Sequence, residues 1–178
     1  TFLKAAREAY LYQIPLLGIN KGNVGFLAEV ETRDIEEALD RIIQGQYTIT
    51  PRMVLNVRVI RSKETVFSDY AINDAVVTRM ALSRILRLRV MLDEQYVDSF
   101  PGDGIIVSTP TGSTGYTLSA GGPIVQPDMR LMVISPICPH ILYSRSHIVS
   151  IDKTVKVTLE DKCEINGMLT LDGQEGFP

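Results

Sequence analysis

The spacing of apolar residues changes once along this chain of 178 residues, close to Gly45. Before that point, over residues 1–13 and 32–45, apolar side chains recur at the period of helices, about 3.6 residues. After it, apolar and polar residues alternate, which is typical of antiparallel strands that bury one face. The sequence therefore predicts a small α/β segment over 1–45, followed by a mostly antiparallel, sandwich-like β domain over 46–178.

Individual elements can be placed within this scheme. We expect Thr32 to cap the second helix and Gly45 to end it, and we expect a short buried strand at 16–19. A short helix is also expected over 114–120. Strands of the β domain are expected at residues 53–60, 86–93, 105–108, 131–135, 155–160 and 169–171.

Composition excludes several classes of protein. Lys and Arg number 18 and Asp and Glu number 21, and no basic run is present, so no nucleic-acid partner is expected. A hydrophobic content of 45% excludes a disordered chain, and the apolar runs are too short for a transmembrane helix. Cys138 and Cys163 form no disulfide framework, and two reduced thiols are typical of a cytoplasmic protein.

Polar and flexible residues are concentrated at 102–123, where an apolar strand runs into a loop. Seven Ser or Thr residues lie from Ser108 to Ser119, with glycines among them. Glycine lets a backbone approach a ligand closely, while amides and hydroxyls bind phosphate or ribose oxygens. The segment has neither a Walker A sequence nor Gly-x-Gly-x-x-Gly. On composition alone, it is consistent both with a nucleotide site and with a turn-rich loop.

A few other residues are candidates for ligand binding. The amide and carboxylate of Asn73 and Asp74 suit ribose hydroxyls, although an Asx turn is the structural alternative. Tyr116 and Phe26 are able to stack on a base, or alternatively pack in a core. The two histidines have no Cys or carboxylate at metal-ligand spacing, so no metal site is expected.

Taken together, these segments resemble the NAD kinase family, whose members use ATP or polyphosphate. The motifs come in the family's order and cover essentially the whole chain. The resemblance rests on segments 22–27, 73–74, 109–114, 137–140 with Arg145, and 172–174. It implies a two-domain fold, in which 1–45 is the remnant of an α/β nucleotide-binding domain and 46–178 is a mostly β NAD-binding domain.

The resemblance also implies which residues bind the adenosine half of NAD. Asn73 and Asp74 match the pair that holds the adenine and ribose region, although Asp74 stands where glutamate is common. Phe26 matches an aromatic residue near the adenine. Positions that line the adenosine pocket are matched by Thr111, Thr114, Gly115, Tyr116 and Ser119. Gly115 stands where alanine is common, which leaves backbone contacts intact.

Other positions are implied for the remainder of the dinucleotide. Asp103 resembles an aspartate that contacts the nicotinamide end. Segment 138–140, which ends at His140, is similar to one that approaches the nicotinamide, often across a subunit interface. Gln174 completes the family's Asp-Gly-Gln motif.

The family's Gly-Gly-Asp-Gly motif, which usually precedes a segment like Thr1–Lys4, is not in the sequence. The final strand and helix that usually follow Asp-Gly-Gln are also not in it. The resemblance therefore implies a fragment. Because the catalytic base is expected in the Gly-Gly-Asp-Gly motif, no catalytic residue is assigned, and the isolated fragment is expected to be inactive.

The implied reaction is phosphoryl transfer from ATP or polyphosphate to the 2′-hydroxyl of the adenosine ribose of NAD, giving NADP. Mg²⁺ or another divalent cation is expected on the donor phosphates. The resemblance further implies a cytoplasmic homodimer or homotetramer without a membrane partner. Two alternatives stay open: a non-catalytic NAD(P)-binding sensor module, and a lipid kinase of the diacylglycerol or sphingosine type. A lipid substrate is disfavoured by the lack of a basic amphipathic helix.

Overall fold

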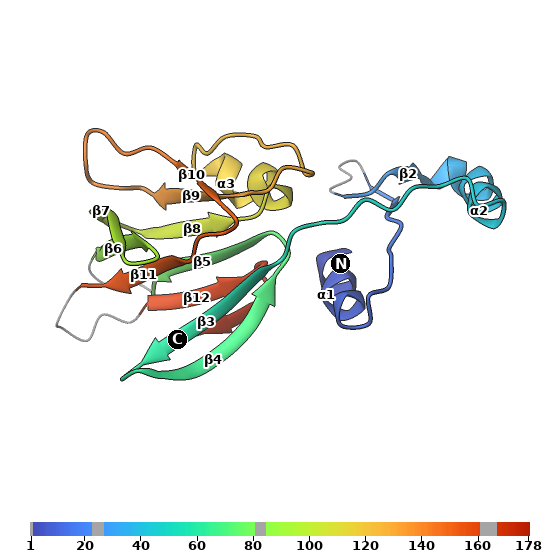
Figure 1. Ribbon diagram of the computed structural model, residues 1–178. Helices are drawn as coiled ribbons and strands as arrows, with labels where there is room; N and C mark the ends of the chain where they lie inside the picture. Colours follow the sequence, from blue (N-terminus) through green and yellow to red (C-terminus); the bar gives the residue numbers. More distant parts are fainter. Residues whose placement is uncertain (1, 23–26, 81–84, 161–166) are drawn as a thin grey trace. The chain divides into compact units, whose positions relative to one another are not determined.

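The computed structural model describes residues 2–22, 27–80, 85–160 and 167–178 of the chain. The chain divides into two compact units, Thr1–Pro51 and Arg52–Pro178 (Figure 1).

The first unit combines helices with a short parallel strand pair. Its elements are α1 (Phe2–Leu11), β1 (Ile19–Asn20), β2 (Val30–Glu31), the 3-10 helix η1 (Thr32–Asp34) and α2 (Ile35–Ile43). Both predicted helices are confirmed. Gly45 follows the second helix with a φ of 71°, a left-handed conformation that glycine adopts without strain and that ends helices.

Two details of this unit differ from the expectation. Leu16 and Leu17 do not lie in a buried strand: both are 43% exposed, and the strand begins only at Ile19, which is itself 46% exposed. Thr32 does not cap the helix. Its hydroxyl instead donates to the carbonyl oxygen of Asn20 at 2.9 Å, which ties the start of η1 to β1.

The second unit is built from antiparallel strands, as predicted (Figure 1). Its larger sheet contains, in spatial order, β10 (His147–Ser150), β9 (Leu131–Ile137), β8 (Gly104–Ser108), β5 (Asp74–Arg79), β12 (Gly167–Leu171) and β13 (Glu175–Phe177). Its smaller sheet contains β11 (Val155–Leu159), β6 (Leu86–Leu92) and β7 (Gln95–Gly102). A separate hairpin is formed by β3 (Leu55–Arg61) and β4 (Glu64–Ala71).

The two sheets share one hydrophobic core, which makes this unit a sandwich as expected. Ile105 and Ile134 come from the larger sheet, and Leu88 and Phe100 come from the smaller one. All are buried in the same cluster, which also includes Leu55 of the hairpin. Burial of these side chains against one another is the main stabilisation of the unit.

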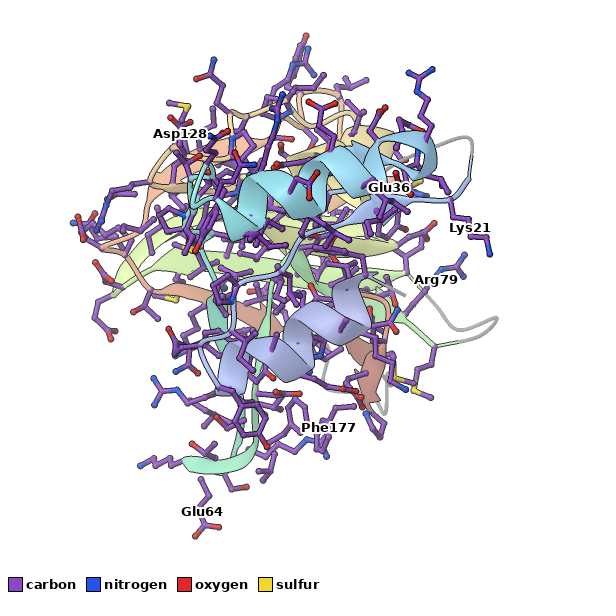
Figure 2. All side chains as sticks on the ribbon, turned by 90° about the vertical axis from the view of Figure 1, so that its right-hand side faces the viewer. Lys21, Glu36, Glu64, Arg79, Asp128 and Phe177 are labelled. Atoms are coloured by element: carbon purple, nitrogen blue, oxygen red, sulfur yellow. The ribbon has the colours of Figure 1, made fainter. Side chains whose placement is uncertain are left out.

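An aromatic pair connects the β3–β4 hairpin to β13. The rings of Phe67 and Phe177 stack with their centroids 4.7 Å apart, and the guanidinium carbon of Arg61 lies 5.5 Å from the Phe177 ring centroid. Figure 2 labels Phe177 and also Glu64, at the turn end of the hairpin. The contact holds the last strand of the larger sheet in place.

Helices in the second unit are short. Instead of one helix over 114–120, the loop after β8 contains η2 (Thr111–Thr114) and α3 (Tyr116–Ser119). The break falls at Gly115, whose φ of −93° and ψ of −127° are not helical. Across the described ranges of the chain, no helix is long and apolar enough to cross a membrane.

The order of the larger sheet brings three chain segments together at one edge. β5 lies between β8 and β12 and runs antiparallel to both (Figure 1). Asp74, at the start of β5, therefore pairs with Ser108 at the end of β8, and Ala75 pairs with Leu171 at the end of β12. The loops that leave β8 and β12 thus meet the loop that enters β5.

The shared core leads to a prediction about stability. Leu88 is fully buried, so Leu88→Ala should lower the free energy of unfolding by about 2–5 kcal/mol, through lost burial and the cavity left behind. Leu142 is 89% exposed, and the same change there should have an effect within about 0.5 kcal/mol. Urea unfolding followed by circular dichroism measures both. Equal effects would contradict the assignment of the core.

Candidate functional site

The segment Ile72–Asp74, which joins β4 to β5, is buried and is held by Asp172, the residue after β12. The carboxylate of Asp172 accepts hydrogen bonds from three consecutive amides. Oδ2 accepts from Ile72 at 2.9 Å, and Oδ1 accepts from Asn73 at 2.6 Å and from Asp74 at 3.2 Å. The Asp172 amide donates in turn to the carbonyl of Asp74 at 3.0 Å.

Thr109, in the loop after β8, binds the carbonyls of the same segment. Its amide donates to the carbonyl of Asn73 at 2.8 Å, and its hydroxyl donates to that of Ile72 at 2.6 Å. The same hydroxyl oxygen accepts the amide of Gly112 at 3.1 Å. A Cβ on Gly112 would lie 2.1 Å from the Asn73 carbonyl oxygen, so only glycine fits where this loop packs on Asn73.

Several buried side-chain oxygens here have no hydrogen-bond partner within the described part of the chain. They are Asn73 Oδ1, Ser108 Oγ, Thr111 Oγ1 and Thr117 Oγ1. An unpaired buried polar atom costs about 1–3 kcal/mol, so such atoms usually bind a ligand or water. Because its Oδ1 is unpaired, Asn73 does not form the Asx turn that the sequence left open. The unpaired oxygens are of the kind that binds sugar hydroxyls.

Asp74 has a shifted protonation equilibrium. Burial and, to a smaller extent, the negative charge of Asp172 together raise the pKa of its carboxyl from 3.8 to about 6. A carboxylate only accepts hydrogen bonds, whereas the neutral acid also donates one. Asp74 therefore changes its hydrogen-bonding character close to neutral pH.

The other residues predicted for the adenosine pocket lie in the loop after β8. Thr111 and Gly112 are buried, whereas a Cβ built on Gly115 would lie 3.9 Å from Asn73 Nδ2. Of the residues predicted for this pocket, Thr114, Tyr116 and Ser119 are exposed. Gln174, predicted from the Asp-Gly-Gln motif, is exposed in the turn after β12. Tyr116 is 45% exposed and is thus available to stack on a ligand. Phe26 lies outside the described residues.

Asp103 and His140 lie at the other end of the same strands. Asp103 Oδ1 forms an ion pair with Nε of Arg79, at 2.9 Å, and Figure 2 labels this arginine. The amide of His140 donates to the carbonyl of Pro101 at 2.7 Å. Arg79 and Asp74 are the two ends of β5, so about 16 Å separates them along an extended strand. Within one chain, the predicted site residues therefore form two groups.

Thr109 and Asp172 were missed as site residues, although both lie in motifs that the sequence displays. Asp172 and Gly173 have φ values of 53° and 62°, and Gln174 closes their turn by donating to the carbonyl of Leu171 at 2.9 Å. An Asp-Gly pair is a recognised signal for such a turn. Nothing in the local sequence indicates that the Asp172 carboxylate binds a segment 98–100 residues earlier.

The raised pKa of Asp74 predicts a pH-dependent contribution to stability. Because the folded state binds this proton more tightly than the unfolded state, the free energy of unfolding should fall as pH rises from about 4 to about 6. The difference between 3.8 and about 6 corresponds to about 3 kcal/mol. Asp74→Asn stays neutral, so its stability relative to wild type should rise over this range by about 2–3 kcal/mol.

Urea unfolding between pH 4 and pH 7 measures this difference. Asp128→Asn is the matched control, because Asp128 is exposed and projects from the surface in Figure 2. A constant stability difference between wild type and Asp74→Asn across that range would show that Asp74 titrates normally.

Comparison with known proteins identifies relatives of this chain. The family model for the C-terminal domain of ATP-NAD kinase matches residues 72–178, and the model for its N-terminal domain matches residues 1–47. The NAD kinase of Acetivibrio thermocellus is 47% identical over 177 residues, which is 99% of this chain and 61% of the relative. The NAD kinase of Moorella thermoacetica is 47% identical over 178 residues, or 99% of this chain and 56% of the relative.

Solved structures agree with the sequence matches. Yeast NADH kinase complexed with NADH superposes with a TM-score of 0.81 at 26% identity, over 89% of this chain and 46% of that one. An NAD kinase from Archaeoglobus fulgidus in complex with ATP gives a TM-score of 0.72 at 26% identity, over 92% and 61%. The chain spans about three fifths of the length of the first curated relatives. From its motifs, its fold and these matches, the chain belongs to the NAD kinase family.

Proposed function

We propose that the protein transfers a phosphoryl group from ATP or polyphosphate to the 2′-hydroxyl of the adenosine ribose of NAD, giving NADP. One observation carries the proposal: the buried, unpaired oxygens of Asn73 and Thr111 belong to the two loops that meet where β5 begins, at Asp74. Family membership supports it, as do the NADH bound to the yeast enzyme and the ATP bound to the Archaeoglobus enzyme.

The chemistry of the site suits the acceptor ribose. Phosphoryl transfer depends mainly on positioning the reactants and on neutralising charge at the moving phosphoryl group. In the proposal, Asn73 and Asp74 accept hydrogen bonds from the ribose hydroxyls, and Thr111 pairs with the same sugar. Tyr116 lies on the exposed side of the loop, where its ring is able to stack on the adenine. Burial of Asn73 and Asp74 keeps competing water away from these hydroxyls.

A divalent cation is part of the proposed reaction, and we tested whether the described residues fit one. Among them, no group of three or more His, Cys, Asp or Glu side chains is placed to hold a metal ion. The carboxylate of Asp172 is already bound by three amides. The described residues therefore do not form a magnesium site, and no step is assigned to the metal.

The second group of predicted residues leads us to propose a homodimer or homotetramer. Asp103 and His140 lie about 16 Å along the strands from Asp74, estimated from the length of β5. Segment 138–140 resembles one that approaches the nicotinamide, often across a subunit interface, and this resemblance supports the proposal. We therefore assign Asp103 and His140 to the NAD site of a second copy. We also infer a cytoplasmic location, with which the exposed free thiol of Cys138 is consistent.

Asn73 provides the test of the proposal. Asn73→Ala should weaken NAD binding by about 10- to 100-fold, because it removes a buried hydrogen bond to the ribose. Asn56→Ala is the matched control, since Asn56 is exposed on β3. Calorimetric titration with NAD measures the affinity, and an NADP-forming assay of the full-length protein with ATP and Mg²⁺ measures the activity.

Three other results would each contradict the proposal. Tight NAD binding by the full-length protein without formation of NADP would indicate the sensor module. Phosphorylation of diacylglycerol but not of NAD would indicate the lipid kinase. Equal NAD affinity for Asn73→Ala and Asn56→Ala would mean that the ribose binds elsewhere.

A further inference from the structure

Two other residues, Asp172 and Thr109, supply a hydrogen-bond partner to every backbone amide and carbonyl of Ile72–Asp74. Every amide of the segment donates to the Asp172 carboxylate, and the carbonyl of Asp74 accepts the Asp172 amide. The remaining carbonyls, of Ile72 and Asn73, accept the hydroxyl and the amide of Thr109. Because each amide and carbonyl of these three residues has a partner, the segment is held in one conformation.

The side chains of Asn73 and Asp74, unlike their backbone groups, lack hydrogen-bond partners among the described residues. Asn73 Oδ1 is buried without a partner, and no hydrogen bond to the Asp74 carboxylate comes from the residues that the structure describes. Asp172 thus fixes the backbone and leaves the two side chains available to a ligand. Hydrogen-bonding groups that are preorganised in this way bind with less entropic cost than groups that must be ordered on binding.

Asp172 adopts a backbone conformation that favours glycine. Its φ of 53° is left-handed, a conformation in which glycine is unstrained and most other residues are not. It is also buried, and a carboxylate is costly to bury unless it is well hydrogen-bonded. Neither the turn nor the hydrophobic core requires an acid here. The carboxylate is therefore best explained by the amides that it binds.

We propose that Asp172 is a positioning residue for the acceptor substrate: by binding the amides of Ile72, Asn73 and Asp74, it orients the side chains of Asn73 and Asp74 toward the ribose of NAD. The inference rests on the proposed function and extends it to a residue that does not itself contact NAD. It assigns Asp172 no proton transfer and no contact with the phosphoryl group.

Asp172→Gly provides the most specific test. Glycine keeps the left-handed turn but leaves the three amides without their acceptor. The Kd for NAD should rise by roughly tenfold or more. Added formate, a free carboxylate small enough for the vacated space, should restore most of the lost affinity. Asp172→Asn should also weaken NAD binding, because the NH₂ group of asparagine cannot accept a hydrogen bond from an amide. Formate should not restore the affinity of this variant, because the asparagine side chain still fills the space that formate would enter.

Asp93→Gly is a closely matched control. Asp93 lies in the turn between β6 and β7, also with a φ of 53°, and its carboxylate accepts the amide of Thr154 at 2.9 Å. It is exposed and lies outside the candidate site. The same change there removes a turn aspartate and its backbone hydrogen bond, so it should leave the Kd for NAD and the response to formate unchanged.

The results separate this inference from the proposed function. If wild type binds NAD and Asp172→Gly binds it equally well, the positioning role is overturned while the proposed function stands. It is also overturned if Asp172→Gly loses affinity but formate restores only the melting temperature, since Asp172 would then be merely structural. If wild type does not bind NAD, both fail. Loss of affinity with recovery in formate, seen for Asp172→Gly but not for Asp93→Gly, supports the inference.

Discussion

The site depends on one buried carboxylate surrounded by backbone amides. Asp172 is separated by about a hundred residues from the amides that it binds, so it connects the β12–β13 turn to the entry of β5. Buried amides and buried carboxylates are each costly alone, and here each satisfies the other. Thr109 adds the loop after β8 to the same junction. Three loops that are distant in sequence thereby form one rigid edge of the sheet.

The proposed function requires a chain with a net charge of −3 to bind an anionic dinucleotide. The polar groups at the edge are hydroxyls, an amide and carboxylates, which suit ribose hydroxyls rather than phosphates. The negative charge of Asp172 is offset by the amides that it accepts, but it still acts on its neighbour, because it helps to raise the pKa of Asp74. The proposed recognition of the ribose therefore needs no basic surface.

The sequence predicted the fold class and many of the strands, because alternation identifies strands that bury one face. It did not predict β5, the strand on which the site depends. Residues 74–76 are consecutively buried, so this strand has no alternation to reveal it. β7 was also not predicted, and Pro101 near its end weakens any strand signal.

Prediction of the site had a similar limit. Asn73, Asp74 and Thr111 were predicted as site residues from their chemistry and their resemblance to a family, and the structure brings them to one edge. The supporting role of Asp172 could not be predicted, because it depends on a hydrogen bond between segments that only the folded sheet brings together. Local sequence shows turns and motifs, but it does not show which backbone groups a distant side chain will bind.

The most direct measurement of the central claim is the NMR signal of the Asn73 side-chain amide during titration with NAD. If Asn73 and Asp74 bind the ribose, this signal and those of the backbone amides of Ile72 and Asp74 will shift as NAD binds, while the side-chain amide of the exposed Asn56 will not. Shifts confined to the region around Asp103 and His140, with Asn73 unchanged, would show that the ribose binds elsewhere.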